Sequence, residues 1–157
     1  MLAGCATYDL QRLAPGTSEN EVLARLGKPV AAGRLVNGEP YWDYSLQPFG
    51  YANYRVTFGP DQRVREVRNL LTPENFRNLR EGMGKSDVAR LLGTTPEIFR
   101  YGNGTTSWTY RFDDSGIIKL THVIFDPSDR VQWFYTEWDP RIYSKDGGGK
   151  SGSGGGR

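Results

Sequence analysis

The fold is decided by a stretch that occurs twice in the chain, first as Leu13-Ala-Pro-Gly-Thr-Ser-Glu-Asn-Glu-Val-Leu-Ala-Arg-Leu-Gly27 and again as Leu79-Arg-Glu-Gly-Met-Gly-Lys-Ser-Asp-Val-Ala-Arg-Leu-Leu-Gly93. In one register the two copies and the residues after them share the pairs Leu13/Leu79, Gly16/Gly82, Val22/Val88, Leu26/Leu92, Gly27/Gly93, Trp42/Trp108 and Tyr44/Tyr110. So many agreements in one register predict a tandem duplication of one unit of roughly 65 residues.

Each copy of the stretch predicts a short helix with defined ends. Ser18, with Glu21 three residues later, is typical of a capping box, and Asp87 keeps a negative charge in the first turn of the second helix. Gly27 and Gly93 end the two helices, because glycine adopts a positive φ without strain. Helical spacing defines one buried face on each, made of Val22, Leu23, Leu26, Val88, Leu91 and Leu92.

Four antiparallel strands are expected after each helix. Asn37-Gly38 is a strong two-residue hairpin signal, and Gly102-Asn103-Gly104 stands at the corresponding place in the second copy. Before the second helix, Thr72 can cap another helix with Pro73 at its first position. The expected strands are 30–36, 41–44, 54–58 and 63–67, then 98–101, 106–112, 117–125 and 130–135.

These elements predict an α+β fold made of two tandem αα-ββββ units. A lone unit of about 65 residues builds a marginal core. We therefore expect the two units to join their sheets edge to edge, with the helices packed on one face of the joined antiparallel sheet. The expected divisions are an N-terminal lead (1–7), a first repeat (8–71), a second repeat (72–143) and a Gly/Ser-rich tail (144–157).

Composition limits the function. The 20 Lys+Arg and 18 Asp+Glu residues give a net charge of +2 and are scattered, which argues against nucleic-acid binding. No apolar run approaches the ~20 residues of a membrane span. One cysteine and one histidine exclude an internal disulfide and argue against a zinc site, so we expect neither a metal nor a cofactor.

The first residues, Met1-Leu-Ala-Gly-Cys5, are similar to a bacterial lipobox. In a lipobox, small residues precede a cysteine whose thiol is acylated and which becomes the mature N-terminus. The basic and apolar regions of a signal peptide do not precede this Cys5, so either the start is shortened or the match is accidental.

Side-chain alternation in the second unit predicts a surface for a partner. Phe125 and Phe134 are assigned to the core, which directs their neighbours on the same strands outward. The predicted partner-binding residues are Trp133, Tyr135, Ile124, Arg111 and His122. Exposed aromatic patches with a polar rim usually mark protein interfaces.

The repeated pattern Gly-x-[Ser/Thr]-x-x-[Glu/Gln]-Val-x-x-x-Leu-Gly, followed by Trp-x-Tyr and a strand with phenylalanine, resembles the SmpA/OmlA (BamE-like) domain. The second copy departs from it at Gly84, where a hydroxyl cap is expected, and at Asp87, which replaces glutamate. The residues that carry the resemblance are Gly16, Ser18, Glu21, Val22, Leu26, Gly27, Trp42, Tyr44 and Phe58, then Gly82, Val88, Leu92, Gly93, Trp108, Tyr110 and Phe125.

The resemblance implies a small outer-membrane lipoprotein on the periplasmic face, anchored through lipid on Cys5. It implies a non-catalytic role in outer-membrane assembly or envelope integrity, with an envelope protein partner such as the barrel-assembly machinery. The tandem form is also similar in architecture to the β-lactamase inhibitor proteins. The alternative is therefore a soluble periplasmic or secreted inhibitor that covers an enzyme's active site with a concave sheet face.

An enzyme is the weakest of the three hypotheses. Catalysis would need a nucleophile with a base, or paired carboxylates in a cleft. Asp113 and Asp114 precede Ser115-Gly116 and are typical of a hairpin turn, and the sequence offers His122 no evident partner for acid–base chemistry. We therefore expect no enzymatic activity.

Overall fold

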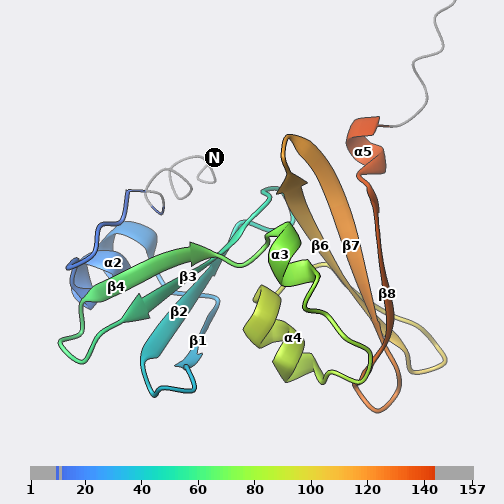
Figure 1. Ribbon diagram of the computed structural model, residues 1–157, viewed down its shortest axis with the longest axis horizontal. Coiled ribbons are helices and arrows are strands. Elements are labelled where there is room, and N and C mark those ends of the chain that lie inside the picture. The colour runs from blue at the N-terminus through green and yellow to red at the C-terminus, as the bar shows by residue number, and fades with distance from the viewer. Residues whose placement is uncertain (1–9, 11, 144–157) are drawn as a thin grey trace, which may run out of the picture.

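The computed structural model describes Leu10 and residues 12–143 and shows an α+β fold with two antiparallel four-stranded sheets (Figure 1). The first sheet has the order β1-β2-β3-β4 and the second β5-β6-β7-β8. The elements are α2 (Glu19–Leu26), β1 (Ala31–Arg34), β2 (Pro40–Ser45), β3 (Asn53–Phe58), β4 (Val64–Asn69), α3 (Pro73–Phe76), α4 (Lys85–Leu92), β5 (Ile98–Arg100), β6 (Thr106–Asp114), β7 (Ile117–Phe125), β8 (Val131–Trp138) and α5 (Pro140–Tyr143).

The expected strands are confirmed in position, but the expectation of one joined sheet is wrong. The two sheets are separate, and α3 and α4 stand between them (Figure 1). Helix α2 packs on one face of the first sheet. Side chains on the opposite face of that sheet bind the end of α4, so the helices do not all lie on one side of it. The physical reason is the character of that second face, which carries Asp43, Asn53 and Arg55 and needs polar partners.

Corresponding positions of the two halves make the same local contacts. Tyr44 donates its hydroxyl to the carbonyl of Gly27 at 3.1 Å, and Tyr110 donates to Gly93 at 2.9 Å. In each half an aromatic pair in edge-to-face geometry lies over the sheet, Trp42 on Phe58 and Trp108 on Phe125. The predicted caps also form, because Ser18 accepts a bond from the amide of Glu21, Asp87 accepts one from Gly84, and Thr72 accepts one from Asn75.

Each half has its own apolar core beneath its helices. Tyr44 and Tyr110 are buried, and burial raises the pKa of Tyr44 to about 12. The first core contains Leu10, Leu13, Val22, Tyr44, Val56, Phe58 and Val64. The second contains Leu71, Phe76, Leu79, Val88, Leu92, Tyr110, Phe112, Val123, Phe125 and Val131.

The junction between the halves is polar and centres on the C-terminal end of α4. Arg55 binds Asp43 through two hydrogen bonds of 2.8 and 2.7 Å and donates a third, of 2.7 Å, to the carbonyl of Arg90. Asn53 donates to the carbonyls of Leu92 and Thr94 at 2.7 and 2.9 Å. The last carbonyls of a helix lack partners within the helix, and here the other half of the chain supplies them.

A pair of glycine substitutions tests this junction. Gly27 and Gly93 end α2 and α4 with φ of 74° and 75°, so alanine at either position should cost about 1–2 kcal/mol of backbone strain. A Cβ at Gly93 would lie 2.9 Å from the Asn53 side-chain nitrogen, whereas one at Gly27 would meet nothing within 4 Å. We expect Gly93→Ala to lower the free energy of unfolding by at least about 1 kcal/mol more than Gly27→Ala in urea denaturation, because buried hydrogen bonds of Asn53 are displaced. Equal losses would contradict the described junction.

Candidate functional site

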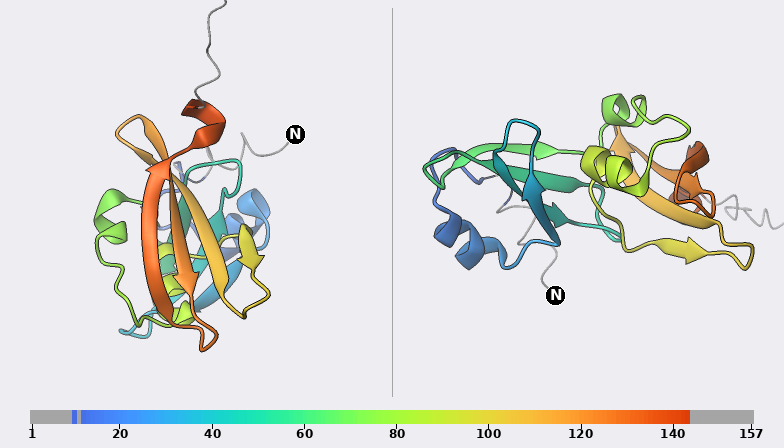
Figure 2. Two further views of the ribbon diagram at one scale, coloured as in Figure 1. Left: turned by 90° about the vertical axis from the view of Figure 1, so that its right-hand side faces the viewer. Right: turned by 90° about the horizontal axis from the view of Figure 1, so that it is seen from below.

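The candidate site is the face of the second sheet that points away from α3 and α4, called the outer face below. No helix lies over its strands in the left view of Figure 2, which looks onto this face. Register places the outer-face residues opposite one another, Thr109 beside His122 beside Tyr135 and Ser107 beside Ile124 beside Trp133. The sequence prediction that Trp133 and Tyr135 point outward is confirmed, since 47% and 41% of these residues' surfaces are exposed.

Three rings form an aromatic row, defined here as Trp133, Tyr135 and His122. Their planes are nearly parallel, with centroids 5.2 Å apart between Trp133 and Tyr135 and 4.7 Å apart between Tyr135 and His122. His122 is held at both nitrogens, by Thr109 at 2.9 Å and Glu137 at 3.0 Å. Burial, with the nearby Glu137 and Tyr101, raises the pKa of Tyr135 above its ordinary value. The row is a fixed apolar surface with polar groups at its edge.

Two of the predicted partner-binding residues are less accessible than expected. Ile124 is on the outer face but only 8% exposed, so it forms the floor beneath Trp133. Arg111 is also 8% exposed, because Asp139 pairs with its guanidinium and the ring of Tyr51 lies 5.0 Å from it. The amide side chain of Gln47 bonds both backbone groups of Arg111. Arg111 therefore belongs to the junction between the halves and not to the exposed surface.

The assignment of Phe134 to the core is also wrong in part. Phe134 pairs with Val123 and so shares the core-side face of the sheet, but it is 37% exposed. It stands on β8, the edge strand, beyond the part of the sheet that the helices cover. Side-chain alternation along the strand correctly predicted that Phe134 points to the core side of the sheet. It could not predict how far the helices extend over that side.

No sequence pattern indicated the group of residues that surrounds Arg111. Asp139 and α5 follow β8 directly, and Asp139 is fully buried between Arg111 and Arg141. Burial alone would raise the pKa of Asp139, but hydrogen bonds from Arg141 and Arg111 outweigh it and hold the pKa below its usual range. A carboxylate that follows an aromatic strand has no distinctive pattern, so this cluster could be found only from the structure.

The outer face differs from its counterpart in the first sheet. Matching cross-strand positions hold Asp43, Arg55 and Arg68 in the first sheet. The second sheet has Thr109, His122 and Tyr135 in the same arrangement. The first set lies on the side that binds the end of α4, and the second set is the open outer face. The two halves therefore differ on this one face, which has charged residues in the first sheet and mainly aromatic residues in the second.

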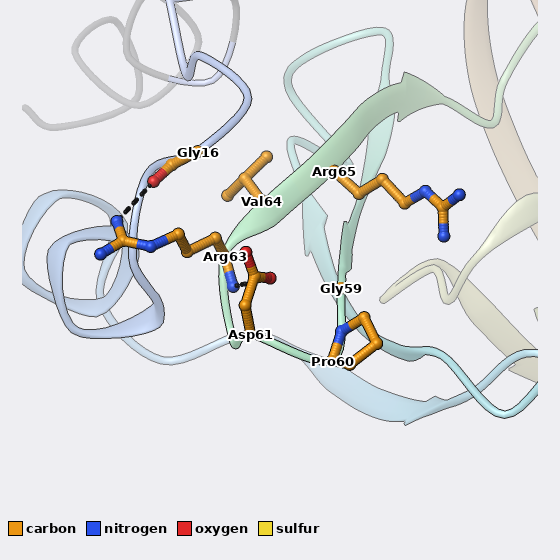
Figure 3. Close-up of a pocket in the computed structure, with 7 residues that line it drawn as sticks. All are labelled: Gly16, Gly59, Pro60, Asp61, Arg63, Val64 and Arg65. Atoms are coloured by element: carbon orange, nitrogen blue, oxygen red, sulfur yellow. Dashed lines mark hydrogen bonds between the residues drawn. The ribbon is translucent and has the colours of Figure 1, made fainter.

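Hollows lie at the ends of several of the described strands. One of about 340 Å³ adjoins the aromatic row and is lined by Tyr101, Asn103, Thr105, Ile124, Gln132 and Trp133. A larger one of about 500 Å³ lies at the turn between β3 and β4 (Figure 3). There Arg63 donates to the carbonyl of Gly16 at 2.8 Å, as Arg130 does to Gly82 at 3.1 Å in the second half. This repeated contact fixes a turn, so we interpret the larger hollow as a consequence of the fold.

Asp113 and Asp114 are engaged in structural contacts. Asp113 accepts a bond from the amide of Gly116 at 2.6 Å, and Asp114 pairs with Lys119, so the predicted hairpin role of both aspartates is confirmed. Among the described residues, no group of three or more His, Cys, Asp or Glu side chains could hold a metal ion. No helix in the described part of the chain is long and apolar enough to cross a membrane. Cys5, the predicted lipid-attachment residue, lies outside the described residues.

Comparison with known proteins leaves the family open. No protein-family model matches the chain, and no curated protein matches it. Among solved structures, the chain is similar to a DUF4309 family protein, YjgB, from Bacillus subtilis, with 15% identity and a TM-score of 0.31 over 88% of this chain and 96% of that chain. At this identity and score the similarity supports no argument about function.

Two tryptophans on opposite faces of the second sheet test the assignment of the faces. Trp133 is on the open outer face, whereas Trp108 packs against the second core beside Phe125. We expect Trp108→Ala to lower the free energy of unfolding by about 3 kcal/mol or more, as for other core aromatics. Trp133→Ala should lower it by about 1 kcal/mol or less, as for surface residues. Chemical denaturation measures both losses, and a larger loss for Trp133 would reverse the assignment.

Proposed function

We propose that the protein is a non-catalytic binding module that engages a protein partner with the outer face of its second sheet. The observation that carries the proposal is the aromatic row of Trp133, Tyr135 and His122, stacked and exposed on a face that no described helix covers. Large rings lose little rotamer entropy on binding and bury much apolar area, so they are efficient anchors in protein interfaces.

The surroundings of the row suit this role. His122 is bonded on both sides and Ile124 is buried beneath the row, so the rings need little ordering when a partner binds. A prearranged surface gains affinity because less conformational entropy is lost on association. The difference between the two sheets supports the same proposal. The first sheet has charged residues at the positions that match the outer face, and it uses that face to bind α4.

We further propose that the chain is a duplicated αα-ββββ unit of the SmpA/OmlA (BamE-like) kind and acts as a bacterial outer-membrane lipoprotein. The doubled motifs support this, as do the matching contacts of Tyr44 with Gly27 and Tyr110 with Gly93. The partner is then an envelope protein, with the barrel-assembly machinery as the first candidate, and Cys5 carries the lipid anchor.

The inhibitor alternative, in which a concave sheet face covers an enzyme's active site, is the second proposal. We prefer the first, because the face of the first sheet that matches the outer face is occupied at α4. A protein that used the outer face of the second sheet alone would bind its partner in the way already proposed.

Site-specific photo-crosslinking in the native host tests the binding surface. Benzoylphenylalanine in place of Tyr135 should crosslink to one discrete protein, whereas the same group at the fully exposed Val36 of the first unit should not. Trp133→Ala should weaken partner binding by about 2 kcal/mol or more, as expected for an aromatic anchor. A Trp133→Ala protein that folds and binds unchanged would contradict the proposed surface.

Mass spectrometry of protein extracted from native membranes tests the anchor. We expect the mature N-terminus at Cys5, with acyl chains whose mass is lost in a Cys5→Ser variant. That variant should also leave the membrane fraction, because the lipid is the proposed attachment. An unmodified Cys5 in native protein would contradict the lipoprotein proposal and leave the binding surface unaffected.

A further inference from the structure

The two sheets have four edge strands, β1, β4, β5 and β8, and these differ in how well they are protected against pairing with another chain. An exposed sheet edge presents unpaired backbone groups, and proteins usually protect it with short strands or charged side chains. Strands β1 and β5 have only 4 and 3 residues. Strand β4 has three charged residues, Arg65, Glu66 and Arg68. Strand β8 has 8 residues and a single charge, that of Glu137.

The duplication makes β8 stand out further. The register of the two sheets shows which positions are equivalent. Glu66 of β4 occupies the place in the first sheet that Trp133 of β8 occupies in the second, and Arg68 corresponds in the same way to Tyr135. The charges that protect the first edge are thus replaced by aromatic residues on the second. Apolar side chains are exposed on both faces of β8, with Trp133 and Tyr135 on one and Phe134 and Trp138 on the other.

Among the described residues, no further strand pairs with β8 along most of its free edge. At its start, Val131 is already paired with Gly82 and Met83. At its end, the amide of Asp139 donates to the carbonyl of Ile118 on β7 at 3.0 Å. Because antiparallel residues point alternately toward and away from their neighbour, the backbone groups of Phe134, Thr136 and Trp138 point outward from the sheet.

We propose that β8 is a strand-addition site, at which an extended segment of the partner pairs with the backbone of Phe134, Thr136 and Trp138. The segment is a polypeptide with apolar side chains on both faces of its strand, matching the aromatic residues on both faces of β8, and a basic residue near Glu137. Cross-strand apolar and opposite-charge pairs stabilise such an addition. This inference rests on the proposed function and names the form in which the partner binds.

The probe is a synthetic peptide, acetyl-Thr-Val-Lys-Val-Trp-Val-Thr-amide, with single-residue positional variants of its lysine. A control peptide with proline in place of the second and third valines keeps apolar residues but cannot present a paired backbone. Binding is measured by isothermal titration, and amide hydrogen exchange is followed by NMR. In the free protein, the amides of Phe134 and Thr136 should exchange fast, while those of Trp133 and Tyr135 are protected by β7.

With the valine peptide bound, we expect the amides of Phe134 and Thr136 to become protected, and the proline peptide to leave them unchanged. Phe134→Pro should weaken binding by about tenfold or more, because it removes an outward donor and blocks pairing while leaving the bonds to β7 intact. Phe134→Ala, which removes only the side chain, should weaken binding less. The exchange measurement uses the unaltered protein, so it decides the matter even if the proline variant does not fold.

Binding without protection of these amides would overturn strand addition, and so would failure of every peptide in the series to bind. If either result is obtained and position 135 still crosslinks to a partner, only strand addition is contradicted. The proposed function then holds, with a partner that contacts the side chains of the outer face and does not pair with the backbone of β8. Strand addition by the peptide without any crosslink from position 135 in the host would instead contradict the proposed function.

Discussion

The contact between the polar face of the first sheet and the C-terminal end of α4 determines how the rest of the molecule is placed. A buried pair such as Arg55 and Asp43 stabilises a fold only when its remaining hydrogen-bonding groups are satisfied, because desolvation is costly. Here Arg55 also bonds the carbonyl of Arg90 and lies over the ring of Tyr41, 4.0 Å from its centroid. These demands are met in one relative orientation of the halves, so the junction is specific as well as stable.

This junction explains why two similar units have different surfaces. Each unit covers one face of its sheet with its own helices and leaves the other face to be satisfied. In the first unit that face is charged and is used to hold the second unit. In the second unit the first half covers this face only around Arg111, and no described element lies over His122, Trp133 and Tyr135. These three residues stand where the first unit has Arg55, Glu66 and Arg68. The first sheet thus uses this face to hold the second half, whereas Trp133 and Tyr135 on the second sheet remain exposed.

Much of the fold could be predicted from sequence because its signals are local. The caps at Ser18 and Thr72, the helix ends at Gly27 and Gly93, and alternation along the strands are decided by neighbouring residues, and the structure confirms them. The relation between the sheets could not be predicted, because Asn53 and Arg55 act through carbonyls far along the chain. The outward direction of Trp133 and Tyr135 was predictable because it depends on alternation along one strand. The burial of Arg111 was not, because it depends on Asp139 and Tyr51, which are distant in the sequence.

Native-state hydrogen exchange, measured residue by residue in β3 and β7, tests most directly whether the polar junction unites the two halves. We predict that the amides of Val56 and Val123 exchange with the same free energy of opening, equal to the global free energy of unfolding, because the halves unfold together. We also predict that Asn53→Ala separates the two values. Different opening free energies in the unaltered protein would show that the halves fold independently and would contradict the central role given to the junction.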